Sequence, residues 1–212
     1  MSLKKMSVAV LMAGCASQAP GTQPGAMSAA EHREHAAAHA EAANEHEAQY
    51  DPDARVRRGG SPTSSEVEYD LDTYNPTVNH LREGGKERDI AQEHEAAAEA
   101  LESFTDAECS EFPPESRKVC PLLTVVTGEE DVPGGARLIL ADGVPPTAVV
   151  DHMLCHHAFA QEKGYIGMPR CPMYLKAVQI SLSPDGKSVQ ITSKDDATVS
   201  EIRKRARAHI SK

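Results

Sequence analysis

The chain has 212 residues, a formal net charge of −10 and only 4% aromatic residues, with no tryptophan. Acidic residues outnumber lysine and arginine by 32 to 22, so the basic excess that neutralises phosphates is missing, and nucleic acid is not an expected partner. The length and the 40% hydrophobic content suit one modest globular domain with additional, poorly packed segments.

The first fifteen residues contain the features of an export signal in their usual order. Two lysines, a short apolar run and two small residues precede Cys15. The sequence Leu-Met-Ala-Gly-Cys that ends at Cys15 resembles the lipobox of bacterial lipoproteins, with Met12 where leucine is usual. The resemblance implies a signal peptide at 1–14, acylation of Cys15 and, because Ala16 follows the cysteine, delivery to the outer membrane.

Composition divides the rest of the chain into four segments. A small-residue, proline-containing composition predicts a flexible tether, and a Ser28–Glu31 capping box predicts the start of an Ala/Glu/His-rich helix. A linker rich in turn-forming residues separates this helix from the folded domain. The predicted bounds are 15–30 for the tether, 31–50 for the helix, 51–78 for the linker and 79–212 for the domain.

The domain is predicted to begin with a helix from about Lys86 to Phe104. Its apolar residues follow a spacing of four and three that places them on one helix face. They are Ile90, His94, Ala97, Leu101 and Phe104. A histidine on such a face, here His94, is expected to be buried and hydrogen-bonded.

The C-terminal half repeats at a constant offset of 51 residues. Cys120-Pro recurs as Cys171-Pro, and the same offset relates Gly135 to Gly186, Leu138 to Val189, Leu140 to Ile191 and Thr147 to Thr198. Each copy predicts two strands and a helix, with strands at 122–127, 136–141, 175–182 and 188–192 and a turn at Ser183–Gly186. The predicted fold class is α+β, with duplicated β-β-α units forming a four-stranded, mainly antiparallel sheet with two helices.

Four cysteines follow Cys15, namely Cys109, Cys120, Cys155 and Cys171. In an oxidising compartment this even number favours two disulfides. Pairing Cys109 with Cys120 and Cys155 with Cys171 would close short loops, whereas pairing Cys120 with Cys171 would join equivalent positions of the repeat. The sequence leaves the three possible connectivities open.

Two groups of residues have metal-ligand spacing. His152, Cys155 and His156 would project from one side of a helix, and imidazole and thiolate together suit copper or zinc. His35 and His39 form an i, i+4 pair that could chelate a second ion. The competing interpretations are that Cys155 is oxidised in a disulfide and that the histidines are ordinary solvated residues.

The sequence contains no motif that is typical of a particular enzymatic reaction, so nothing in it supports an enzymatic function. We therefore expect a lipid-anchored cell-envelope protein with a non-catalytic structural or interaction role. Its expected partners are the membrane, through the anchor, and an envelope protein or cell-wall polymer. The alternative is a periplasmic protein that binds copper or zinc.

Overall fold

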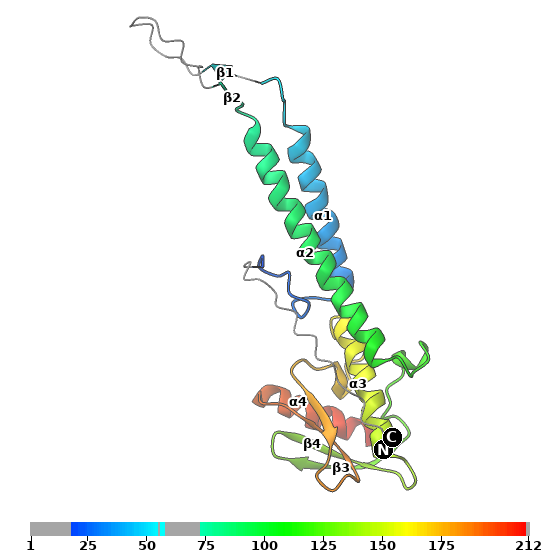
Figure 1. The fold of residues 1–212 in the computed structure, drawn as a ribbon. Helices are drawn as coiled ribbons and strands as arrows, with labels where there is room; N and C mark the ends of the chain where they lie inside the picture. Colours follow the sequence, from blue (N-terminus) through cyan, green and yellow to red (C-terminus); the bar gives the residue numbers. More distant parts are fainter. Residues whose placement is uncertain (1–17, 55, 58–72, 211–212) are drawn as a thin grey trace, which may run out of the picture.

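The computed structural model describes residues 18–54, 56–57 and 73–210. Cys15 and the expected signal peptide lie outside the described residues, as does most of the expected linker. The described chain forms a long helical hairpin that extends from an α+β domain (Figure 1). Among these residues, no helix has the length and apolar character that crossing a bilayer requires.

The hairpin consists of α1, Ala29–Ala48, and α2, Val78–Glu108. The two helices are antiparallel, since His32 near the start of α1 contacts His94 while His46 near its end contacts His80. The predicted capping box is confirmed, because the Ser28 hydroxyl accepts from the Glu31 backbone and the Glu31 carboxylate accepts from the Ser28 backbone. Two short strands, β1 Val56–Arg57 and β2 Thr73–Tyr74, lie at the tip.

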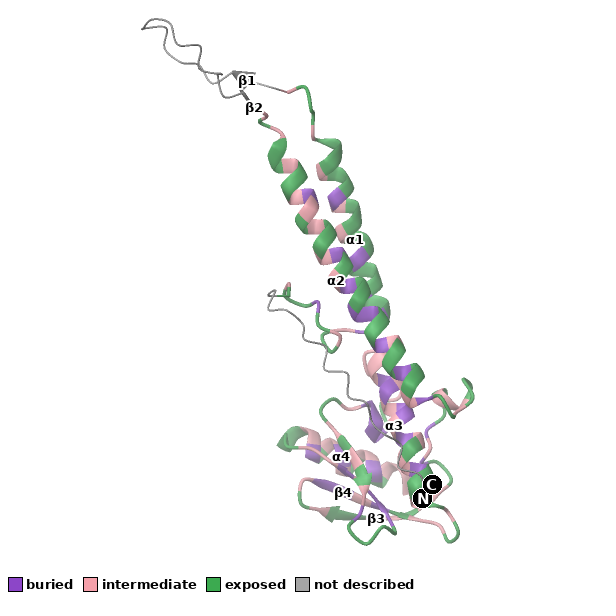
Figure 2. Ribbon diagram, viewed as in Figure 1, coloured by how far each residue is buried: buried purple, intermediate pink, exposed green. Residues whose placement is uncertain are grey.

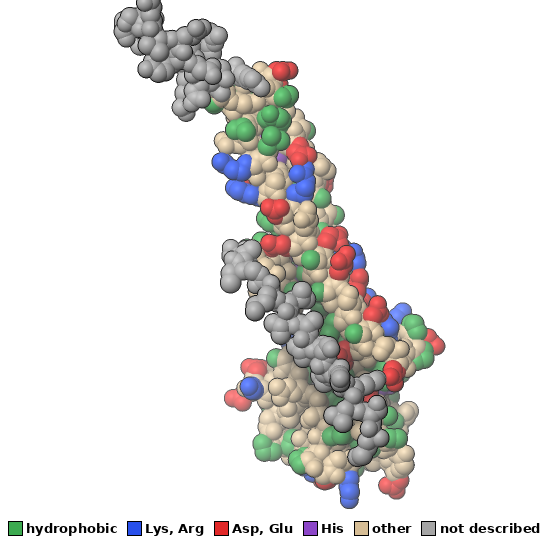
Figure 3. All heavy atoms as spheres, viewed as in Figure 1, with side chains coloured by type: hydrophobic (Ala, Val, Ile, Leu, Met, Phe, Trp, Pro, Cys, Tyr) green, Lys and Arg blue, Asp and Glu red, His purple; other side chains and the backbone are tan. Residues whose placement is uncertain are grey.

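Small side chains allow α1 and α2 to approach closely. Ala36, Ala43 and Ala91 are buried along the seam, which runs as a broken purple stripe between the helices in Figure 2. Acidic and basic side chains mark the outer surface (Figure 3), where Arg33 pairs with Glu95 and Glu102. Alanines can pack helix on helix without a stripe of large apolar residues, which is why the composition of the first helix did not indicate this seam.

The buried face of α2 differs from the predicted stripe. His94, Ala97 and Leu101 are buried as predicted, whereas Phe104 is 46% exposed. At the two ends of the stripe, Ala91 and Thr105 are buried in place of Ile90 and Phe104. His94 is buried and hydrogen-bonded, as its position on the apolar face indicated.

The domain contains a four-stranded antiparallel sheet with strand order β3-β4-β6-β5. The strands are β3 Val126–Val132, β4 Gly135–Leu140, β5 Gln179–Leu182 and β6 Val189–Thr192. The helices α3, Pro146–Glu162, and α4, Asp196–Ile210, pack on the sheet, and two short 3-10 helices, η1 Ser116–Lys118 and η2 Pro172–Tyr174, precede β3 and β5. The α+β class is confirmed, with four α-helices in the described chain.

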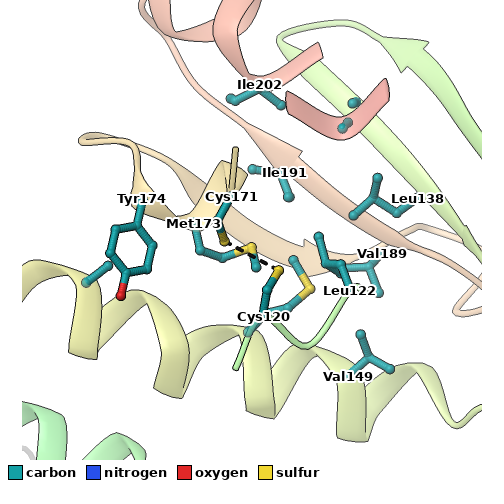
Figure 4. Packing of buried hydrophobic residues seen from close by; sticks show 14 residues of the cluster. Cys120, Leu122, Leu138, Val149, Cys171, Met173, Tyr174, Val189, Ile191 and Ile202 are labelled. Carbon is teal, nitrogen blue, oxygen red and sulfur yellow. Dashed lines mark hydrogen bonds between the residues drawn. The ribbon is translucent and has the colours of Figure 1, made fainter. Parts of the chain in front are cut away.

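The core lies between one face of the sheet and the two helices. Leu138, Val189 and Ile191 point from the central strands into the core between Val149 of α3 and Ile202 of α4 (Figure 4). The intervening residues Arg137, Ile139 and Gln190 lie on the open face. This alternation is what a sheet with one buried face requires.

The first predicted strand is wrong in position, since 122–127 precedes most of β3. Leu122 is instead a buried loop residue of the core, and β3 is an edge strand that carries Glu129, Glu130 and Asp131. Charged residues are common on edge strands, which is why a search for apolar alternation passed over it. The Ser183–Gly186 turn is confirmed, and Gly186 adopts a φ of +69°.

A disulfide between Cys109 and Cys155 connects the end of α2 to α3. Beside it, the buried Thr105 hydroxyl lies 3.2 Å from the Ala158 carbonyl oxygen of α3. These contacts fix the base of the hairpin against the domain.

Two adjacent glycines of α2 test the hairpin packing. A Cβ on Gly84 would lie 3.1 Å from the Ala43 carbonyl oxygen, whereas one on Gly85 would meet nothing within 4 Å. Alanine raises helix propensity by about 1 kcal/mol at either position. We expect Gly85→Ala to raise the midpoint of thermal unfolding followed by circular dichroism, and Gly84→Ala to raise it less or lower it. Equal gains in both variants would contradict the docking of α1 on α2.

Candidate metal centre

Cys120 and Cys171 approach each other inside the domain. Cys120 follows η1 and Cys171 immediately precedes η2, and both side chains are buried. Their sulfur atoms are 3.5 Å apart and point toward one another among the core residues (Figure 4). Within the described part of the chain neither sulfur forms a disulfide.

His156 of α3 completes a buried group with the two cysteines. One donor atom from each of Cys120, His156 and Cys171 lies within 4.8 Å of the others. The Nδ1–H of His156 donates to the Arg117 carbonyl oxygen at 2.8 Å, because η1 runs past α3 at this point. The lone pair of His156 is therefore on Nε2, which is buried and finds no hydrogen-bond partner among the described residues.

His209, near the end of α4, extends the group to four side chains. Its Nε2 is 3.3 Å from the Cys120 sulfur, and its Nδ1 lies 2.9 Å from the Arg205 carbonyl oxygen one turn earlier. Donation from Nδ1 to that carbonyl leaves Nε2 facing the sulfur, where it can donate to a thiolate when the ring is protonated or ligate an ion when the ring is neutral. Both histidines thus have the arrangement common in metal ligands, in which the second ring nitrogen donates to a backbone carbonyl.

The electrostatics of the group favour one thiolate in the absence of metal. The hydrogen bond with Cys171, with a further contribution from His209, lowers the pKa of Cys120 although burial opposes ionisation. The same hydrogen bond, together with burial, raises the pKa of Cys171. The contact with Cys120 raises the pKa of His209, whereas burial lowers the pKa of His156 and keeps that ring neutral.

The donor set fits a tetrahedral metal ion. Two thiolates bound to zinc at about 2.3 Å would lie about 3.8 Å apart, close to the observed sulfur separation. Two thiolates with two imidazoles is a common ligand set for structural zinc, and it also suits copper(I). The residues present could therefore hold a metal ion at Cys120, His156 and Cys171, and His209 lies beside Cys120.

A pocket of about 420 Å³ leads from the surface to this group. Cys120, Cys171 and His209 form part of its wall, and the remaining lining is mainly apolar and includes Leu123 and Met168. An ion thus has an entry path from solvent to the sulfur atoms.

The structure separates the predicted trio of His152, Cys155 and His156. Cys155 is not available as a ligand, because it is bonded to Cys109. His152 stacks on Phe112 and its Nε2 lies 3.3 Å from the Ser116 carbonyl oxygen, so it also turns away from the cysteines. Of the three, only His156 belongs to the buried group.

The cysteines combine differently from the short loops considered in the sequence. Neither Cys109–Cys120 nor Cys155–Cys171 pairs, because the disulfide joins Cys109 to Cys155. One disulfide is present rather than two, and the equivalent residues Cys120 and Cys171 lie together without a bond. The recurrence of Cys-Pro at 51 residues was the signal for this contact. No sequence signal pointed to His209.

The predicted pair on the first helix lies elsewhere, on the hairpin. His35 is exposed and His39 is partly buried, and both stand beside His94 of α2. This group is separate from the cysteines in both sequence and donor chemistry.

No family model, curated protein or solved structure matches this chain. The proposals that follow therefore rest on the geometry of its own residues.

Thiol labelling tests the division of the cysteines. Because Cys120 and Cys171 line a pocket while Cys109 and Cys155 are bonded and fully buried, we expect iodoacetamide to modify Cys120, the thiolate, before Cys171 and to leave Cys109 and Cys155 unmodified in folded, metal-free protein. Peptide mapping by mass spectrometry after timed labelling measures this. Modification of Cys109 or Cys155 before a reductant is added would contradict the observed pairing.

Proposed function

We propose that this protein binds a metal ion with filled d orbitals, Zn²⁺ or Cu⁺, through Cys120, Cys171, His156 and His209. The observation that carries the proposal is the buried His156: its Nε2 has no hydrogen-bond partner among the described residues, and one of its ring nitrogens lies within 4.8 Å of both sulfur atoms. A buried polar atom without a partner is costly, and a bound ion would satisfy it.

Zinc is the ion that the donor set favours. Four protein ligands of the sulfur and nitrogen type saturate a tetrahedral ion, which leaves no open position for a substrate. This supports a structural or storage role rather than catalysis. Copper(I) is the competitor, because Met168 lines the same pocket and could supply a thioether.

We further propose that the domain consists of two fused β-β-α units. Residues related by the 51-residue offset meet at its centre, since Leu138 of β4 and Val189 of β6 are partners in the sheet. Cys120 and Cys171 obey the same offset and also meet. A metal ion between these cysteines would therefore join the two units.

The location remains a proposal that rests on the first fifteen residues. A lipid on Cys15 would place the metal-binding domain on an envelope membrane, at the end of a helical hairpin. In an oxidising compartment a bound ion would also protect the Cys120 and Cys171 thiolates from disulfide formation, because coordinated sulfur is less available for oxidation.

The anchor has a direct test in the native host. Cys15→Ala is expected to move the protein from the membrane fraction to the soluble fraction, because acyl chains supply the binding energy of a lipid anchor. Fractionation and immunoblotting measure the change, with Cys120→Ser as the control that retains its membrane association. Membrane association of Cys15→Ala equal to that of the wild type would contradict acylation at this residue.

Metal binding is tested by titrating reduced, metal-free protein with Zn²⁺ in competition with a chromophoric chelator. We expect Cys120→Ser, Cys171→Ser and His156→Ala to weaken binding by more than the roughly 10–100-fold that loss of an outer hydrogen-bond partner costs. His152→Ala is the matched control on the same helix, and its affinity should be unchanged because His152 lies outside the group.

Circular dichroism of each metal-free variant separates lost ligation from lost folding. His209→Ala serves where a core variant fails to fold, because His209 is only partly buried and is not part of the hydrophobic core. Zinc affinity that is the same in wild type, His156→Ala and His209→Ala would refute the proposed site. A folded, fully reduced wild type that binds neither ion would refute the function.

A further inference from the structure

Three histidines of the hairpin converge from two helices. His35 and His39 lie on α1, His94 lies on α2, and one ring nitrogen from each is within 4.8 Å of the others. The rings of His35 and His39 stack against that of His94, with centroids 5.2 and 5.7 Å apart. The α1 pair has the i, i+4 spacing that allows two imidazoles to reach one ion.

Contacts behind the rings determine which nitrogen is available. The Nδ1–H of His39 donates to the Glu87 carboxylate at 2.6 Å, so its Nε2 has a free lone pair. This carboxylate–histidine contact is the one that orients histidine ligands in metal sites. Nδ1 of His94 lies 2.9 Å from Nδ1 of the buried His32, so Nε2 is the His94 nitrogen left for an ion when Nδ1 carries the shared proton.

We propose that His35, His39 and His94 form a second metal site that takes a borderline divalent ion such as Zn²⁺ or Cu²⁺. Three imidazoles without a thiolate suit these ions, and a fourth position stays open to solvent because His35 is exposed. Glu87 and His32 are positioning residues of this site. The ion would tie α1 to α2, so its binding would stabilise the hairpin.

This site is independent of the cysteine site. It draws no ligand from the α+β domain, and its donors are all nitrogen, so it would retain affinity under oxidising conditions that remove thiolate ligands. Failure of either site leaves the proposal for the other intact.

The experiment uses the full chain with Cys120→Ser and Cys171→Ser, titrated with Cu²⁺ and followed by electron paramagnetic resonance. We expect one ion with nitrogen ligands, and an affinity at least tenfold lower when His35→Ala or His39→Ala is added. His46→Ala is the matched control, since His46 lies on the same helix but contacts His80 instead. Affinity in His35→Ala and His39→Ala equal to that of the control would overturn the site.

Thermal unfolding supplies a second readout that does not depend on the double-serine background. In the wild-type chain, a second equivalent of Zn²⁺ beyond the first should raise the midpoint of helix unfolding. The rise should persist in His46→Ala and disappear in His39→Ala, a variant at a partly exposed position. A rise that persists in His39→Ala, or none in the wild type, would contradict a metal link between α1 and α2.

Discussion

The approach of Cys120 and Cys171 to 3.5 Å is the contact on which the organisation of the domain depends. The two cysteines precede the two halves of the sheet, and His156 and His209 bring α3 and α4 to the same point. Two loops and two helices thus meet at the polar atoms of these four side chains, inside an apolar core. Such a group has to be satisfied internally, because buried polar atoms without partners destabilise the fold. The proposed metal ion would satisfy the polar atoms of Cys120, His156 and Cys171.

The four cysteines form two different pairs, one bonded as a disulfide and one free. The Cys109–Cys155 disulfide joins the hairpin to the domain, while the other pair remains available within the domain. His152, one turn from His156 on α3, is not part of the group, because its ring stacks on Phe112 and its Nε2 faces the Ser116 carbonyl oxygen. Cys155 occupies the helix face toward α2, and His156 occupies the face toward η1. Cys155 and His156 are adjacent in α3 but contact different parts of the structure.

Sequence patterns predicted the features that depend on residues close together in the chain. The capping box at Ser28, the turn at Ser183–Gly186 and the α+β class follow from short-range spacing and alternation. The buried group of Cys120, His156, Cys171 and His209 was not predicted as a whole. Its members lie up to 89 residues apart in the sequence, and their contact depends on how the helices lie on the sheet. The packing of α1 against α2 was also not predicted, because an Ala/Glu/His composition is typical of a solvated spacer as well as of a closely packed helix pair. Long-range information came from the 51-residue offset, which relates Cys120 to Cys171 and Leu138 to Val189.

Zinc K-edge X-ray absorption tests the central claim most directly. The sample is the reduced chain with His35→Ala and His39→Ala, loaded with one equivalent of Zn²⁺, so that the hairpin histidines do not contribute. The account predicts two sulfur neighbours at about 2.3 Å and two nitrogen neighbours at about 2.0–2.1 Å. A spectrum with nitrogen and oxygen neighbours alone would contradict a metal centre at Cys120 and Cys171.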